Sequence, residues 1–234
     1  MESLPLQIAE TLTESPGDLI FDMDGTLLEG DLGEGFYRER VSESEPDQAL
    51  VELFAGRPWD DPNVLPIREG CMACSMALAG MTPDEIFARV DVWFSDGRVR
   101  IFDQVVEVVR MTRDAGHRPW LVTGSSIWIG RAVAQRVGIE VEHVIGVENV
   151  IEVGRLTSRI VEPVSAGAGK VLAWGKRMNT QPLLTLGDSR HDLPLMAASK
   201  YGGVLVYSEA TADQDVLSAA RALGFTCWPL VNAP

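Results

Sequence analysis

The chain has 234 residues, a formal net charge of −14 at pH 7 and a hydrophobic content of 46%. The hydrophobic content suits a buried core and excludes a disordered chain. The excess of acidic residues excludes a surface that binds the nucleic-acid backbone through clustered Lys and Arg.

The first residues, MESLPLQIAE, lack the basic stretch and apolar run of a secretion signal. No uninterrupted apolar segment approaches the roughly 20 residues that a membrane span requires. The three cysteines form an odd number, which favours reduced thiols. We therefore expect a cytoplasmic protein without a membrane partner, in which Cys71 and Cys74 pack on one apolar helix face.

Four short apolar runs predict buried strands, and three of them end abruptly in polar turns. Continuous runs of this kind are typical of parallel sheets, where strands are covered on both faces. The runs are 19–21, 120–122, 183–186 and 203–207.

Helical patterns separate these runs along the chain. Apolar residues recur at helical spacing after Phe102, with Gly116 as a stop, and a second helix is expected from Ser126 to Val137. Two more helices are expected near Lys170 and Asp192. This alternation predicts an α/β fold with a doubly wound parallel sheet. The exception is 150–160, where two short stretches flank Gly154-Arg155 and predict a hairpin.

A segment near the N-terminal end differs from this pattern. Between 29 and 98, helical signals replace the strand-like runs, and Thr82-Pro83-Asp84-Glu85 is typical of a helix start. We expect residues 29–98 to form a small helical cap, called the insert below. The core would consist of 1–28 and 99–234. An insert at this point overlooks the carboxyl ends of the strands, where ligands bind in such sheets.

Polar side chains follow three of the predicted strands, and a lysine lies between the last two. In a parallel sheet these strand ends share one edge, so the side chains can converge. Crowded carboxylates repel one another unless a hard cation such as Mg²⁺ neutralises them. A metal, a lysine, a hydroxyl and backbone N–H groups are what phosphoryl transfer requires. The side chains are those of Asp22, Asp24, Thr123, Lys170, Asp188 and Asp192.

At these residues the chain resembles the haloacid dehalogenase superfamily, and within it the phosphoserine phosphatase-like branch. Four motifs occur in the family's order and span most of the chain. They are Asp22-Met23-Asp24-Gly25-Thr26, Thr123 within LVTGS, Lys170 within AGAGKVLAW, and Gly187 to Asp192, GDSRHD.

The resemblance implies a Rossmann-like core and a Mg²⁺-dependent phosphatase that hydrolyses a small-molecule phosphate monoester. Asp22 would form an aspartyl-phosphate, and Asp24 would act as general acid and then base. Asp192 would either complete the metal site or orient Lys170. The implied phosphate-binding residues are Thr123, Gly124 and Lys170, and the implied metal ligands are Asp22, Asp24 through its carbonyl, Asp188 and Asp192.

Three positions bear on the substrate. Asp31 matches an acidic residue that contacts the substrate amine in phosphoserine phosphatases. Cys74 stands where those enzymes carry an arginine for the substrate carboxylate, and His191 stands where they carry Asn. Arg68 is near Cys74 but out of register. We expect a phosphorylated amino acid or amino alcohol, and the two departures argue against phosphoserine itself.

The sequence is also compatible with other functions. Aromatic residues could cradle a quaternary ammonium group such as that of phosphocholine. A phosphotransferase or mutase would use the same nucleophile, and a catalytically silent phosphate-binding protein would use neither Asp22 nor Asp24 for chemistry. The oligomeric state does not follow from the sequence. The aromatic residues are Phe36, Tyr37, Trp59, Trp93 and Trp128.

Overall fold

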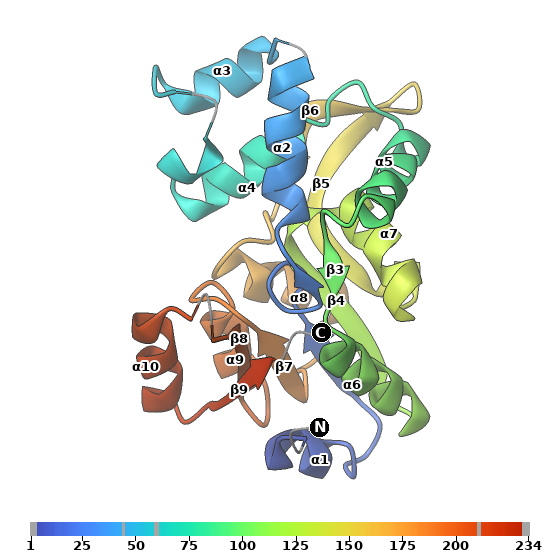
Figure 1. The fold of residues 1–234 in the computed structure, drawn as a ribbon, viewed down its shortest axis with the longest axis vertical. Helices are drawn as coiled ribbons and strands as arrows, with labels where there is room; N and C mark the ends of the chain where they lie inside the picture. The colour runs from blue at the N-terminus through green and yellow to red at the C-terminus, as the bar shows by residue number, and fades with distance from the viewer. Residues whose placement is uncertain (1–3, 44, 59–60, 210–211, 231–234) are drawn as a thin grey trace.

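The computed structural model describes residues 4–43, 45–58, 61–209 and 212–230. Seven strands form one sheet in the order β6-β5-β4-β1-β7-β8-β9 (Figure 1). The strands are β1 Asp18–Phe21, β4 Arg118–Ser126, β5 Val144–Glu152, β6 Arg155–Val161, β7 Leu184–Gly187, β8 Gly203–Ser208 and β9 Thr226–Leu230.

The sheet is parallel apart from the β5–β6 pair, which confirms the predicted doubly wound architecture. β1 lies at its centre between β4 and β7. Leu19, Ile20 and Phe21 are all fully buried, because successive side chains of a strand point to opposite faces and helices cover both. Leu19 and Phe21 belong to one apolar cluster, and Ile20 belongs to another.

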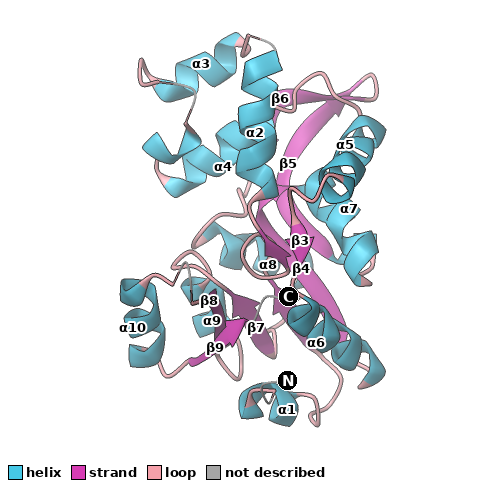
Figure 2. Ribbon diagram, viewed as in Figure 1, coloured by secondary structure: helices cyan, strands magenta, loops and turns pink. Residues whose placement is uncertain are grey.

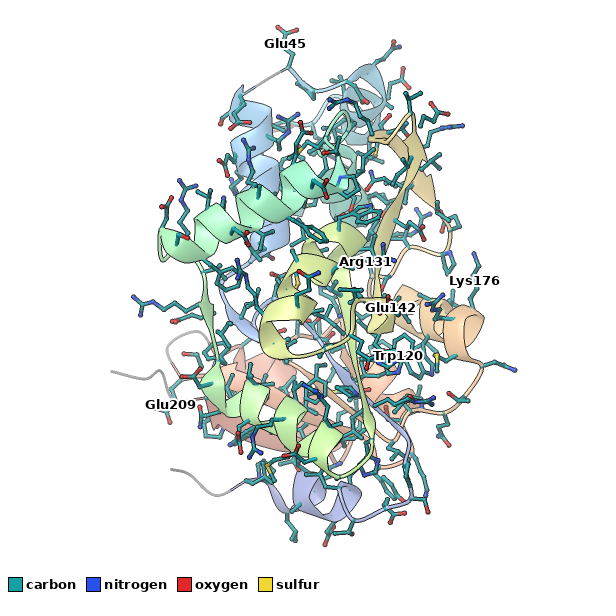
Figure 3. All side chains as sticks on the ribbon, turned by 90° about the vertical axis from the view of Figure 1, so that its right-hand side faces the viewer. Glu45, Trp120, Arg131, Glu142, Lys176 and Glu209 are labelled. Carbon is teal, nitrogen blue, oxygen red and sulfur yellow. The ribbon has the colours of Figure 1, made fainter. Side chains whose placement is uncertain are left out.

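Helices cover both faces of the sheet (Figure 2). Trp120 packs in the cluster beneath α8, with its ring centroid 5.3 Å from that of Trp174 (Figure 3). The helix expected from Ser126 to Val137 is present as α7, and Gly138 caps its end in the left-handed conformation. The core helices are α1 Leu6–Thr11, α6 Asp103–Asp114, α7 Ile127–Val137, η2 Val141–His143, α8 Gly169–Met178, α9 Leu193–Ala198 and α10 Gln214–Ala222.

The predicted hairpin is present as β5 and β6. Its turn residues Val153 and Gly154 both have positive φ, of 50° and 77°, which is typical of tight hairpin turns. β5 begins earlier than the pattern indicated, because its first part pairs in parallel with β4. Only its second part, from Glu148, pairs antiparallel with β6.

The insert region begins and ends at a two-stranded antiparallel sheet, formed by β2 Leu28–Glu29 and β3 Arg100–Ile101. The described residues between these strands contain helices and loops only. Thr82 makes the predicted helix start, with a reciprocal capping box to Glu85. The division into core and insert domains stays a prediction. The helices are α2 Leu32–Glu43, α3 Gln48–Phe54, η1 Pro62–Val64, α4 Ile67–Met76 and α5 Pro83–Ser95.

Among the described residues, the sequence patterns did not indicate α1, α10 and β9, the short strands β2 and β3, or the single turns η1 and η2. α1 is only six residues long, and β9 carries a proline within an edge strand, so neither has a distinct apolar period. In the part of the chain that the structure describes, no helix combines the length and the apolar character needed to cross a membrane.

Candidate active site

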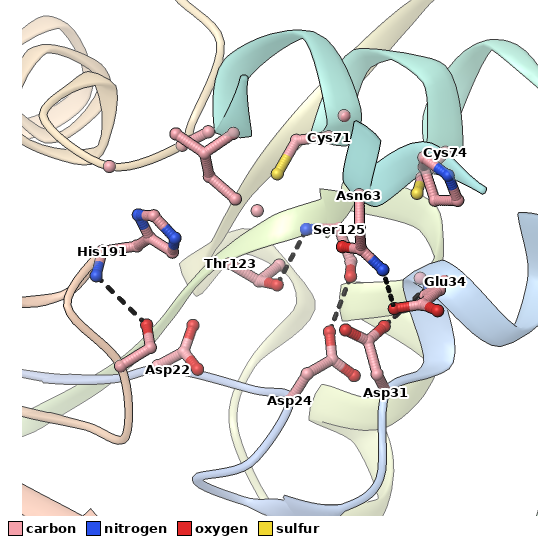
Figure 4. A pocket seen from close by; sticks show the side chains of 18 of the residues that line it. Asp22, Asp24, Asp31, Glu34, Asn63, Cys71, Cys74, Thr123, Ser125 and His191 are labelled. Atoms are coloured by element: carbon pink, nitrogen blue, oxygen red, sulfur yellow. Dashed lines mark hydrogen bonds between the residues drawn. The ribbon is translucent and has the colours of Figure 1, made fainter. Parts of the chain in front are cut away.

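The register of the central strands brings the predicted side chains to one edge of the sheet. Phe21 lies opposite Leu121 on one side and Leu186 on the other. The residues that follow these positions therefore meet at the carboxyl ends of β1, β4 and β7. A cavity of about 420 Å³ opens here, between the sheet edge and the helices α2 and α4 (Figure 4). The predicted residues that line it are Asp22, Asp24, Asp31, Cys74, Thr123, Gly124, Lys170, Asp188 and His191.

At the base of the cavity, Lys170 joins two aspartates. Its Nζ lies 2.5 Å from Asp22 Oδ1 and 2.6 Å from Asp192 Oδ1, and all three side chains are buried. Ser189 donates to the other oxygen of Asp192 from its N, at 3.1 Å, and from its Oγ, at 2.8 Å. Although burial acts in the opposite direction, Lys170 lowers the pKa of Asp192. Asp192 is therefore held ionised beneath Lys170.

Asp22, Asp188 and Asp192 each place one carboxylate oxygen within 4.8 Å of the others. Burial, followed by the charge of Asp192, raises the pKa of Asp22 to about 7. Burial and then the charge of Asp22 raise the pKa of Asp188. These oxygens repel one another without a cation, and a small hard ion such as Mg²⁺ fits this donor set. Asp22 and Asp188 line the cavity and are the more open pair, whereas Asp192 lies behind Lys170, with hydrogen bonds to both of its oxygens.

The close approach of Asp188 to the turn after β1 explains why residue 25 is a glycine. Its φ is +77°, and an added Cβ would lie 2.2 Å from Asp188 Oδ2. Only glycine satisfies both the backbone conformation and the space. Thr26 also stands between the two carboxylates, with its Oγ1 3.3 Å from Asp22 Oδ2 and 3.5 Å from Asp188 Oδ1.

Asp24 lies apart from Lys170 and is held by two donors. The backbone N of Leu32 donates to its Oδ1 at 2.8 Å, and Ser125 Oγ donates to its Oδ2 at 2.6 Å. Burial, followed by the charge of Asp31, raises the pKa of Asp24 well above its ordinary value. Burial thus raises the pKa of both Asp22 and Asp24, but their surroundings differ: Lys170 opposes the rise at Asp22, and hydrogen bonds from Ser125 and Leu32 oppose it at Asp24.

Thr123 does not end its strand, contrary to the pattern in the sequence. β4 continues to Ser126, with an irregular register against β5 between Val122 and Ser126. The backbone N of Ser125 donates to Thr123 Oγ1 at 3.0 Å. The sequence does not single out Ser125, because a serine at the end of a strand carries no distinctive signal.

The sequence profile of the haloacid dehalogenase-like hydrolases matches residues 19–197, which is more than half of the chain. The chain belongs to this family. This hydrolase is 22% identical over 200 residues to a phosphoserine phosphatase of Archaeoglobus fulgidus, a match covering 83% of the chain and 54% of the relative. The chain therefore spans about half the length of that curated relative.

Two solved structures show the same fold as this haloacid dehalogenase-like hydrolase. A Bordetella pertussis Tohama I protein of unknown function matches with a TM-score of 0.70 and 22% identity, over 92% of the chain and 99% of the neighbour. A substrate-bound phosphoserine phosphatase complex matches with a TM-score of 0.59 and 12% identity, over 92% and 93%. At these identities the likeness concerns the fold alone.

The far end of the cavity is acidic, and its acids differ in their partners. Glu34 is neutralised by Arg38, at 2.5 Å, and accepts from Asn63 at 3.0 Å. Asp31 accepts from the backbone N of Glu34 at 2.7 Å but has no Lys or Arg partner among the described residues. Asp31 is partly exposed where it lines the cavity. Even so, desolvation by the surrounding protein raises its pKa, and the charge of Glu34 raises it by a smaller amount.

Cys71 and Cys74 are free thiols of α4 that line the cavity, although packing was expected for both and a bearing on the substrate for Cys74 only. Burial raises the pKa of Cys71 to about 12 and that of Cys74 in the same direction. Protonated thiols are poor nucleophiles, and a thiol cannot replace an arginine as partner of a carboxylate. Arg68 does not compensate, since it pairs with Glu162 and Glu69.

His191 lies on the other side of the cavity, close to the loop before α8. Its backbone N donates to Ser189 Oγ at 3.2 Å. Burial lowers the pKa of the imidazole, so the ring is neutral at pH 7. Among the described residues, Lys170 is consequently the sole permanent cation in the lining.

The alternative of an aromatic cradle for a quaternary ammonium group finds no support among the residues that the structure describes. None of its aromatic side chains lines the cavity. Phe36 and Tyr37 are fully buried, and Trp93 packs against Phe36 at 5.3 Å between ring centroids. These rings lie on the faces of α2 and α5 that pack against apolar neighbours. There the rings bury more surface than they would in an open cavity. Trp128 stacks beneath Arg131, and Trp59 lies outside the described residues.

Proposed function

We propose that this hydrolase is a Mg²⁺-dependent phosphomonoesterase that works through an aspartyl-phosphate on Asp22. Family membership and the phosphoserine phosphatase among its relatives support a phosphoric monoester hydrolase. The main support is the contrast between two aspartates of one turn. Asp22 contacts Lys170 at 2.5 Å, whereas Asp24 accepts its hydrogen bonds from the backbone N of Leu32 and from Ser125 Oγ.

In the first half of the reaction, an oxygen of Asp22 forms a bond to phosphorus while the bond to the ester oxygen breaks. Asp24 gives its proton to the departing alkoxide, so a neutral alcohol leaves. In the second half, Asp24 takes a proton from water, whose oxygen bonds to phosphorus and releases phosphate from Asp22. Lys170, the Thr123 hydroxyl and the Gly124 N–H would hold the phosphoryl oxygens.

Asp22, Asp188 and the Asp24 carbonyl would hold the metal ion, which supplies charge neutralisation for the phosphoryl group. Asp192 would orient Lys170, because its oxygens are already occupied by Lys170 and Ser189. Because its pKa is lowered, the Asp192 carboxylate stays negatively charged beside Lys170 at neutral pH.

The direct test measures phosphate release from an aryl phosphate with Mg²⁺ and with a chelator. Free phosphate that depends on Mg²⁺ supports the proposal. Transfer of the phosphoryl group to an added sugar or alcohol, with little free phosphate, would identify a phosphotransferase. Binding of phosphate without turnover of any ester would identify a silent binding protein.

Mg²⁺ is expected to stabilise the folded protein more at high pH than at low pH. The folded state binds more protons than the unfolded state because the pKa of Asp22 is raised to about 7. The stability of the metal-free protein therefore falls, for this group, as pH rises from about 4 toward 7, while Mg²⁺ competes with the same protons. At about 100 times its Kd the ion adds about 3 kcal/mol, or about 5 to 11 °C in Tm.

Thermal denaturation at about pH 6 and about pH 8, with and without Mg²⁺, checks this expectation. Asp188→Asn is the matched control, since it removes one oxygen ligand and should abolish the Mg²⁺-induced rise in Tm. An equal rise in the Asp188→Asn protein would contradict the metal site.

For the substrate, we propose a phosphorylated amino alcohol. Asp31 offers a carboxylate with no cationic partner among the described residues, which suits an ammonium group. No arginine of the described chain lines the cavity, so a substrate carboxylate would remain unpaired near Asp31 and Glu34. This difference argues for phosphoethanolamine-like esters over phosphoserine.

Replacing Asp31 by Asn is expected to raise KM for an amine-bearing ester by about 10- to 100-fold, the loss of one charged contact. The amide oxygen still accepts from the Glu34 N, so α2 keeps its cap. KM for a neutral alkyl phosphate should stay unchanged. Glu34→Gln is the matched control with a small effect, because Arg38 already neutralises Glu34. Equal changes in KM for both esters would refute an amine site.

A further inference from the structure

Ser125 lines the cavity between Thr123 and Asp24. The residue is 6% exposed, and its hydroxyl donates to Asp24 Oδ2 at 2.6 Å, the shorter of the two hydrogen bonds that Asp24 accepts. Its backbone N donates to Thr123 Oγ1 at 3.0 Å. One residue therefore contacts both the proposed acid and the proposed phosphate-binding hydroxyl (Figure 4).

Two residues at the start of α2 also contact Asp24 and Ser125. Leu32, the first residue of α2, donates its backbone N to the other oxygen of Asp24 at 2.8 Å. Gly33 packs so closely that an added Cβ would lie 2.3 Å from Ser125 Oγ. A side chain at position 33 would displace the hydroxyl, so glycine here lets α2 reach Asp24 and Ser125 together.

We propose that Ser125 is a positioning residue for Asp24. It fixes the orientation of this carboxyl group between β4 and the first turn of α2. The inference rests on the proposed phosphatase function. Ser125 acts through Asp24 and takes no part in bond making, so its effect depends on how much the leaving group needs a proton.

A merely structural role for this hydroxyl is less well supported. The neighbouring Ser126 accepts from the backbone N of Trp128 and caps α7. The hydroxyl of Ser125 instead donates across about a hundred residues of chain to Asp24. Ser126 is thus a matched control, being a buried serine of the same turn whose hydroxyl serves the helix.

The test compares an alkyl phosphate, whose alkoxide needs protonation, with an aryl phosphate, whose phenolate leaves unaided. For Ser125→Ala we expect kcat with the alkyl ester to fall by about 10- to 100-fold, as for a misplaced catalytic group. KM should change little, and kcat with the aryl ester should fall by less than about 3-fold. Ser125→Thr, which keeps the hydroxyl, should restore most of the alkyl rate.

Two further variants make the outcome decisive. Ser126→Ala should lower Tm through the lost helix cap while leaving the ratio of alkyl to aryl rates unchanged. In an Asp24→Asn background, Ser125→Ala should have no further effect on that ratio. Equal losses with both esters, or a full additional loss beside Asp24→Asn, would overturn the inference while leaving the phosphatase function intact. A wild-type protein that hydrolyses neither ester would overturn both.

Discussion

Replacing Asp22 by Asn is expected to reduce kcat by about 10³-fold or more while the protein stays folded. The amide cannot form the acyl phosphate, and removal of a nucleophile costs more than removal of a residue that only assists it. The fold should tolerate the change. The carboxylate is buried, and its raised pKa, about 7, shows that its charge is disfavoured there. Lys170 keeps Asp192 as a partner.

Three measurements define this result. Steady-state release of phosphate gives the loss in kcat, and thermal denaturation in the presence of a chelator gives the stability. Mass spectrometry after an acid quench should detect a phosphoryl adduct in the wild-type protein and none in the Asn variant.

Asp22→Glu is the matched control for charge. It keeps the carboxylate but moves its oxygens by about one methylene, which misplaces the attacking atom. Low activity in both variants supports a nucleophile, whereas wild-type activity in Asp22→Glu would reduce Asp22 to a source of charge. An active Asp22→Asn protein would contradict the mechanism altogether.

Replacing Lys170 by Met should affect both stability and activity. The lysine lies between two buried carboxylates, with 2.5 Å to Asp22 and 2.6 Å to Asp192. Removing one partner of a buried ion pair leaves uncompensated charge and costs about 3 to 5 kcal/mol. The free energy of unfolding in the presence of a chelator should fall by roughly this amount. Activity with Mg²⁺ should fall by about 10²-fold or more, as on loss of a donor to the transition state.

The double variant Lys170→Met with Asp192→Asn separates these two effects. With the second charge removed, much of the lost stability should return, since Asp192 no longer needs a cation. Activity should not return, because the phosphoryl group still lacks Lys170. Recovery of both would show that Lys170 is only structural.

Lys176→Met is the matched control for the Lys170 series. Lys176 lies on the same helix, exposed, and donates to the backbone O of Glu162. Its replacement should change the free energy of unfolding by about 0.5 kcal/mol or less. A loss as large as that of Lys170→Met would assign the effect to α8 as a whole.

The sequence by itself determined the parallel sheet and the edge at which the polar residues gather. Buried strands need continuous apolar runs, and the turn after each run exposes whatever side chain follows it. Asp22 after β1 and Asp188 after β7 could therefore be placed together before any coordinates. Their neighbourhood follows from strand order in a parallel sheet, since all carboxyl ends share one edge.

The tertiary structure alone decided how each of these side chains is used. Asp192 has both oxygens engaged by Lys170 and Ser189, which no spacing in the sequence reveals. Ser125 reaches Asp24 because the fold places the ends of β1 and β4 side by side, although the two residues are 101 positions apart in the sequence.

The physical reason lies in the range of the interactions. Strand and helix patterns depend on neighbours along the chain, whereas two decisive contacts of the site join residues that are far apart, 148 positions for Lys170 and Asp22 and 101 positions for Ser125 and Asp24. Phe36 illustrates the same limit, because only the packing of α2 against Trp93 shows that its ring belongs to the core and not to the cavity.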